Sequence, residues 1–141
     1  MIFLVVDVNV VISALLGVGD SYGIFARSRK EQKFWFITPE FLLVELNKHS
    51  SETARRTNFS LEEAQIVSNF ISKKVIFVNE YFYEEKVEEA RTILRGHEKD
   101  APYLALALTM NCNILSGDKT FKRLCPDKVK NPKEILQELN K

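Results

Sequence analysis

The N-terminal stretch Met1-Ile-Phe-Leu-Val-Val-Asp-Val-Asn9 decides the predicted fold. Its bulky and β-branched apolar residues do not alternate with polar ones, which predicts a strand buried on both faces and therefore in the middle of a sheet. Asp7 follows this strand directly, and α/β sheets build their binding sites at the carboxyl ends of parallel strands. Asp7 is therefore a candidate site residue, although Asp7 or Asn9 could also simply cap the helix that begins near residue 8.

Length and composition predict one globular domain over residues 1–141. The chain is 45% hydrophobic and carries a formal charge of +1, and this near-neutral average can hide an acidic pocket inside a basic rim. Cys112 and Cys125 form no CxxC pair, which favours reduced thiols in a cytoplasmic protein. The first apolar run lacks a preceding basic region and is interrupted by Asp7, so we expect neither a secretory signal nor a membrane anchor.

Strand and helix patterns alternate along the chain. This alternation predicts a three-layer α/β/α fold with a central, mainly parallel sheet of about five strands. Two helix caps are predicted. Thr38 is expected to cap a helix that starts at Pro39, and either Asp20 or Ser21 is expected to cap the helix that starts in the glycine-rich segment 17–23. Ser60 and Glu63 are predicted to form a capping box for a third helix. Residues 48–73, in the most polar third, are expected to form a helical excursion. The further strands are predicted at 34–37, 75–78, 113–115 and 127–130, and the later helices at 60–72, 84–94, 101–109, 119–124 and 132–139.

Two groups of cations are candidates for contact with an RNA backbone. One group ends the second predicted helix and the other lies in the polar excursion; they comprise Arg27, Arg29, Lys30, Arg55 and Arg56. Such residues bind phosphates in nucleic-acid complexes. For the first group, cations also suit a helix C-terminus, and an ordinary solvated face remains an alternative.

Four acidic residues are predicted to converge. Asp118 follows the strand at 113–115 as Asp7 follows the first, and right-handed crossovers bring the ends of central strands side by side. Glu45 and Asp100 add two carboxylates, with a surface glutamate and a helix cap as the alternatives. Such a cluster repels itself unless cations or protons intervene. Oxygen ligands without His or Cys favour Mg²⁺ or Mn²⁺, which can activate water and clamp a phosphodiester.

Four segments resemble, in chain order, the four motifs of PIN domains. They are Asp7-Val8-Asn9, Glu45-Leu46, Asp100-Ala101-Pro102-Tyr103-Leu104-Ala105-Leu106-Ala107 and Ser116-Gly117-Asp118-Lys119. The resemblance covers nearly the whole chain. Among PIN domains, the chain is similar to the VapC-type toxin ribonucleases of prokaryotic toxin–antitoxin pairs. It implies a Mg²⁺- or Mn²⁺-dependent endoribonuclease in which the catalytic, metal-binding acids are Asp7, Glu45, Asp100 and Asp118, with Asn9, Ser116 and Lys119 in supporting roles.

The resemblance also implies partners, namely an RNA substrate, a second copy of the chain in a homodimer and an antitoxin protein. Some PIN domains carry a further acid just before the third motif. In this chain Glu98 lies two residues before Asp100, and whether it is a fifth ligand stays open.

Three other classes of protein compete with this interpretation. A phosphoaspartate hydrolase would need a second aspartate where Asn9 stands. A receiver domain would need paired acids after the first strand and a phosphoacceptor after the third, where the chain has Asn79 and Glu80. A catalytically silent PIN fold that binds RNA or a protein partner is the strongest rival, although four retained carboxylates without a use would destabilise the fold.

Overall fold

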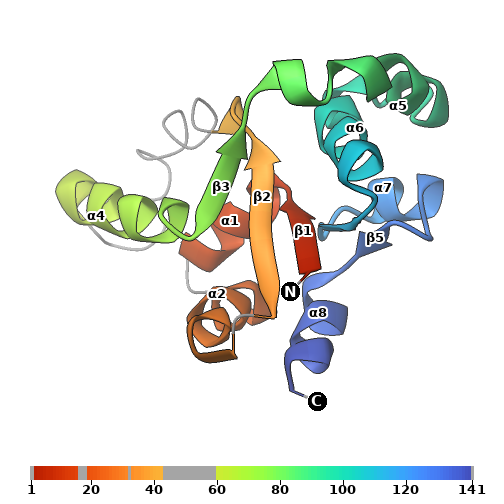
Figure 1. Cartoon of the computed structure of the whole chain (residues 1–141). Coiled ribbons are helices and arrows are strands. Elements are labelled where there is room, and N and C mark those ends of the chain that lie inside the picture. The colour runs from red at the N-terminus through yellow and green to blue at the C-terminus, as the bar shows by residue number, and fades with distance from the viewer. Residues whose placement is uncertain (1, 16–18, 32, 43–59, 141) are drawn as a thin grey trace.

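The computed structural model describes residues 2–15, 19–31, 33–42 and 60–140. Within these ranges the strands form one sheet in the order β3-β2-β1-β4-β5, with every neighbouring pair parallel (Figure 1). The predicted α/β class and the central position of the first strand are confirmed. The strands are β1 Ile2–Val6, β2 Phe34–Pro39, β3 Val75–Val78, β4 Asn113–Leu115 and β5 Val129–Lys130.

Helices cover the sheet on both faces and give three layers. On one face, α1 (Val8–Leu15), α2 (Gly19–Glu31) and α8 (Pro132–Leu139) pack on the sheet, and α4 (Leu61–Ser72) contacts α1 and β3. On the other face lie α5 (Val87–Ile93), α6 (Ala101–Met110) and α7 (Lys119–Leu124), with the short 3-10 turns η1 (Glu80–Phe82), η2 (Glu84–Lys86) and η3 (Glu98–Asp100).

Strand β1 contributes side chains to both cores. Leu4 and Val6 belong to the cluster under α1, α2 and α8, whereas Val5 belongs to the cluster under α6. Successive side chains of a strand point to opposite faces, so a sheet covered on both sides needs apolar residues at every position. Only the start of β1 departs from the prediction of complete burial, because Ile2 is exposed.

Helix α6 is buried almost all round, as predicted. Its residues Ala101 and Tyr103 to Ala107 are all buried, and it contacts β1, β2 and β4. Asn111 caps the C-terminus of the helix in a left-handed backbone conformation (φ 50°). Its N–H donates to the carbonyl oxygens of Ala107 and Leu108 in the last turn. Asparagine is one of the few residues other than glycine that adopts this conformation readily.

Both predicted helix caps at 20–21 and 38 are wrong. Strand β2 continues through Thr38 and Pro39, and the Thr38 hydroxyl donates to the carbonyl oxygen of Val6 (2.8 Å) instead of capping a helix. Pairing of Pro39 with Val78 of β3 keeps this end of β2 extended. Helix α2 begins at Gly19, so Ser21 lies inside its first turn and is buried.

The capping box before α4 is confirmed, since the Glu63 N–H donates to Ser60 Oγ (3.0 Å) and the Ser60 N–H donates to Glu63 Oε1 (3.2 Å). The stretch 43–59, which includes Glu45, Arg55 and Arg56, lies outside the described residues. The excursion at 48–73 therefore stays a prediction in its first part. No helix in the described ranges is long and apolar enough to cross a membrane.

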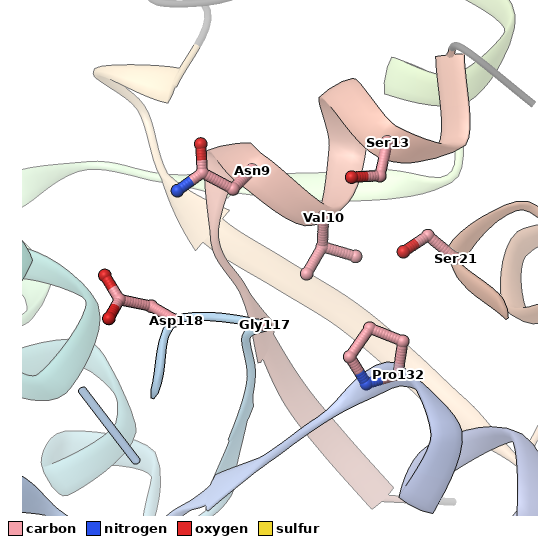
Figure 2. A pocket seen from close by; sticks show the side chains of 7 residues that line it. All are labelled: Asn9, Val10, Ser13, Ser21, Gly117, Asp118 and Pro132. Carbon is pink, nitrogen blue, oxygen red and sulfur yellow. The ribbon is translucent and has the colours of Figure 1, made fainter. Parts of the chain in front are cut away.

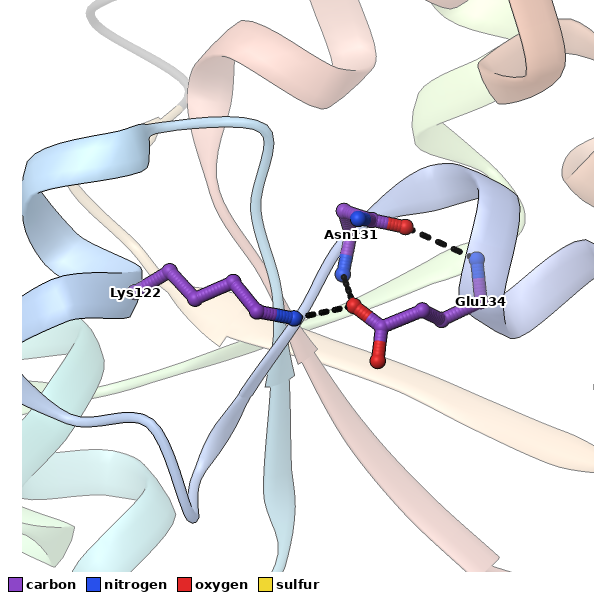
Figure 3. A network of polar contacts seen from close by, with 3 residues as sticks. All are labelled: Lys122, Asn131 and Glu134. Atoms are coloured by element: carbon purple, nitrogen blue, oxygen red, sulfur yellow. Dashed lines mark hydrogen bonds and ion pairs between the residues drawn. The ribbon is translucent and has the colours of Figure 1, made fainter.

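A second capping box starts α8 and links it to α7. The Glu134 N–H donates to Asn131 Oδ1 (2.8 Å), and the Asn131 N–H donates to Glu134 Oε1 (3.1 Å). The same Glu134 oxygen accepts a hydrogen bond from Lys122 Nζ of α7 (Figure 3). Mainly because of this bond to Lys122, the pKa of Glu134 lies below its ordinary value.

Candidate active site

Asp7 is fixed at the end of β1 by contacts with two neighbouring segments. Its N–H donates to the carbonyl oxygen of Leu115 in β4 (3.1 Å), which holds the two strand ends side by side. Its Oδ1 accepts hydrogen bonds from the N–H groups of Asn9 (2.7 Å) and Val10 (3.3 Å) in the first turn of α1. Asp7 therefore acts as the predicted helix cap and is also held at the sheet edge where the site was expected.

Ser116 joins the ends of β1 and β4. Its hydroxyl donates to Asp7 Oδ2 and accepts a hydrogen bond from the N–H of Asp118 (3.1 Å), while its own N–H donates to the carbonyl oxygen of Lys130 at the end of β5 (3.0 Å). One buried hydroxyl thus fixes the orientation of the first carboxylate and the backbone position of the second. The two aspartates predicted to be neighbours are linked through this single side chain.

Asp118 caps α7 with one of its two carboxylate oxygens. Oδ1 accepts hydrogen bonds from the N–H groups of Thr120 (2.8 Å) and Phe121 (3.1 Å). Its other oxygen, Oδ2, accepts no hydrogen bond from the residues that the structure describes. Asp118 therefore keeps one oriented carboxylate oxygen for a ligand.

Asp100 stands at the start of α6 but does not cap it. The residue is only 9% exposed, and its side chain makes no capping bond to the helix. The pKa of the Asp100 carboxyl is raised to about 6, mainly by burial and also by the negative charges of Asp118 and Asp7, against smaller opposing effects of Lys99 and His97. The alternative of an ordinary helix cap is therefore excluded for Asp100.

The three aspartates form one electrostatic group. Burial is the largest cause that raises the pKa of Asp7, which is 3% exposed; hydrogen bonds from Ser116, Asn9 and Val10 oppose it, and the charge of Asp118 adds to it. The carboxyls of Asp7 and Asp100 are thus shifted toward the neutral form, and the charge of Asp118 contributes to both shifts. Such a group gains stability from a cation or from protons.

The donor atoms fit a hard divalent cation, because the converging groups carry oxygen. Among the described residues no three His, Cys, Asp or Glu side chains lie close enough to enclose an ion by themselves, and the predicted ligand Glu45 falls outside the described ranges. Mg²⁺ commonly binds through one or two carboxylates, several waters and substrate phosphates, so it requires no enclosing cage. The residues present suit an ion shared with a phosphate-containing substrate.

A pocket of about 250 Å³ adjoins Asp118 (Figure 2). In Figure 2, Asn9 and Asp118 lie at one end, and Ser13 and Ser21 lie at the other. Its walls come from α1, α2, the β4–α7 loop and the start of α8; the lining residues are Asn9, Val10, Ser13, Ser21, Gly117, Asp118 and Pro132. Nothing in the sequence marks Ser13 or Pro132 as site residues, and Ser21 is predicted as a possible cap, because no local pattern shows that four separate segments meet there.

The remaining predicted residues are distributed as follows. Asn9 is exposed and lines the pocket, whereas Lys119 is exposed at the first position of α7. Glu98 is exposed in η3 and is not among the groups that shift the pKa of Asp100. Arg27, Arg29 and Lys30 belong to α2 by their backbone, but the positions of their side chains lie outside what the structure describes.

A family model of the PIN domain matches residues 5–139, a range that contains all four predicted acids. The chain belongs to the PIN domain family. PIN domains are generally nucleases that use divalent metal ions, and the oxygen-rich sheet edge of this PIN domain agrees with such a use. The resemblance stated from the four motifs is thereby confirmed at the level of the family.

The fold of this PIN domain is similar to a solved structure of VapBC2 from Rickettsia felis bound to a DNA fragment from their promoter. The TM-score is 0.69, the sequence identity is 16%, and the match covers 93% of this chain and 98% of that chain. At this identity the likeness shows the shared fold. No curated protein matches the chain.

Proposed function

We propose that this PIN domain is a Mg²⁺- or Mn²⁺-dependent endoribonuclease of the toxin type. The observation that carries the proposal is that Asp7 and Asp118 follow the adjacent strands β1 and β4 and are linked through Ser116, while their charges reach the buried Asp100 carboxyl. Asp100 supports it most directly, because a buried carboxylate that makes no cap is destabilising unless it has another role. We assign Glu45 as the fourth acid from its place in the PIN motifs.

The protein's own residues would orient the substrate and the ion. Asp7 is held by α1 and Ser116, so its carboxylate cannot rotate freely, and Asp118 presents its free oxygen from the start of α7. Asn9 is exposed at the same edge and can donate to a phosphate oxygen through its amide. A bound divalent ion would activate water and neutralise charge that develops on the phosphate. Because these side chains are already held in position, the site requires less reorganisation during the reaction.

The partner proposals are an RNA substrate, an antitoxin protein and a second copy of the chain. Support for a protein partner comes from the fold shared with VapBC2, and support for RNA comes from the PIN motifs and the cations of α2 and of residues 55–56. The homodimer follows only from the family resemblance.

The deciding experiment is cleavage of a structured RNA by the purified chain with Mg²⁺, with Mn²⁺ and with EDTA. We expect cleavage only with metal, and products with 5′-phosphate and 3′-hydroxyl ends, because activated water rather than the ribose 2′-hydroxyl attacks phosphorus. A 2′-deoxy substitution at the cut should therefore not by itself prevent the reaction. Products with 2′,3′-cyclic phosphate ends in EDTA would refute the carboxylate mechanism. RNA binding without cleavage under all conditions would favour a silent scaffold.

A further inference from the structure

The pocket beside the carboxylates contains an unsatisfied polar side chain. Ser21 is only 4% exposed, and its hydroxyl has no hydrogen-bond partner among the residues that the structure describes. In those ranges, every fully buried side-chain nitrogen or oxygen has a hydrogen-bond partner. Because the Ser21 hydroxyl has none, it is not fully buried, and it lines the pocket. Figure 2 shows it directed from α2 toward Val10 and Pro132. A nearly buried hydroxyl that faces a pocket is available to a ligand atom there.

Two further lining side chains also have free hydrogen-bonding groups. The hydroxyl of Ser13 and the amide of Asn9 make no side-chain hydrogen bond within the described part of the chain. By contrast, Thr92 and Thr109, which also lie on helices, donate to the carbonyls of Glu88 and Ala105 in their own helices. At the end of the pocket away from Asp118, the hydroxyls of Ser13 and Ser21 offer both donors and acceptors to a neutral polar group.

The walls of the pocket disfavour a phosphate and favour a flat, partly apolar ring. None of the described lining residues carries a positive charge, so the part of the pocket away from the acidic site offers nothing that would neutralise a phosphate. Val10 and Pro132 provide apolar surface, and a Cβ added at Gly117 would meet no atom within 4 Å, so space is open beside this loop. A volume of about 250 Å³ is small for a drug-sized ligand but suits one ring system.

We infer that this pocket binds the base of the nucleotide next to the scissile phosphate and that Ser13 and Ser21 read its polar edge. The inference rests on the proposed function for its substrate class, and Asp118 lines both the pocket and the acidic site. Proteins read RNA sequence mainly through unstacked bases that are hydrogen-bonded along their edges. A site whose polar groups stay unpaired with the wrong base discriminates against that base.

The first test measures binding of adenosine, cytidine, guanosine and uridine by backbone amide NMR without metal. These probes carry no phosphate, so neither metal nor cleavage is required. We expect one nucleoside to bind best, with shifts at Ser13, Ser21 and Gly117, and the 2′-deoxy form to bind equally well. The Ser13→Ala/Ser21→Ala double variant should weaken it at least about fivefold. Alanine is well tolerated in helices, and Thr92→Ala is the matched control that should change nothing.

The inference is wrong if no nucleoside shifts these amides, if the double variant binds like the wild type, or if binding depends on the 2′-hydroxyl and not on the base.

A second test maps cuts in a randomised RNA with Mg²⁺. The wild type should prefer one base at a position adjacent to the cut, and the double variant should lose this preference. Cleavage with an unchanged preference in the variant would overturn the inference and leave the proposed nuclease intact. Absence of cleavage by the wild type would overturn the nuclease, while the nucleoside arm would still decide the pocket.

Discussion

Asp118 combines a structural and a chemical role in one carboxylate. Its Oδ1 accepts two backbone hydrogen bonds from α7, whereas its charge raises the pKa of Asp100 and Asp7. An asparagine keeps the accepting oxygen and loses the charge. The two roles can therefore be separated by comparing two substitutions at this position.

We expect Asp118→Asn to lower metal-dependent cleavage about 100-fold or more and to leave the metal-free stability equal or higher, because repulsion inside the acidic group is relieved. Asp118→Ala should lose the cap as well and cost about 1 kcal/mol relative to Asp118→Asn. Urea unfolding in EDTA and RNA cleavage measure the two effects. Full activity of Asp118→Asn would remove Asp118 from the proposed site.

Asp100 should make the metal-free stability depend on pH. Its folded pKa of about 6 lies above the ordinary value of 3.8, so the folded state holds the proton more tightly than the unfolded chain. The associated stabilisation is complete below pH 3.8 and is lost as the pH rises through 6, by an amount on the order of 3 kcal/mol. Comparing wild type with Asp100→Asn in EDTA between pH 4 and 7.5 isolates this effect. A difference in unfolding free energy that stays constant over this range would contradict the burial of a titrating Asp100.

At the scale of elements, the start of α8 is fully capped and is also linked to α7. Both bonds of the Asn131–Glu134 capping box are present, and Lys122 adds a link from α7. Behind this terminus, Ile135 and Leu139 are buried in the core under α1 and α2. The cap therefore fixes the helix that supplies Pro132 to the pocket wall.

Asn131→Ala is expected to destabilise the fold by about 1 kcal/mol, while Asn131→Asp, which keeps the accepting oxygen, should cost clearly less. Lys122→Met should have the smaller effect of a half-exposed ion pair. Thermal or urea unfolding of the three variants provides the measurement. Equal stability of Asn131→Ala and wild type would show that the cap contributes nothing.

The whole molecule is nearly neutral, with an acidic sheet edge and cations elsewhere. We expect RNA binding to weaken with salt, with a slope of about −0.7 per phosphate contacted on a single strand. The Arg55→Gln/Arg56→Gln variant should reduce this slope, and Lys86→Gln, whose parent side chain pairs with Glu89, serves as the control. Affinity measured from 50 to 300 mM salt tests the prediction; an affinity insensitive to salt would mean that these cations are only a solvated face.

The sequence by itself determined the sheet, its central strand and the meeting of Asp7 with Asp118. These features depend on local patterns and on chain order, since a strand without polar alternation must be buried and right-handed crossovers place neighbouring strand ends together. Local signals failed at Thr38 and Pro39, where pairing of β2 with β3 keeps the chain extended in place of the helix start that this dipeptide favours. Only the tertiary structure decided that Asp100 is buried without a capping role and that Ser21 faces a pocket, because both depend on segments far apart in the chain that pack against one another.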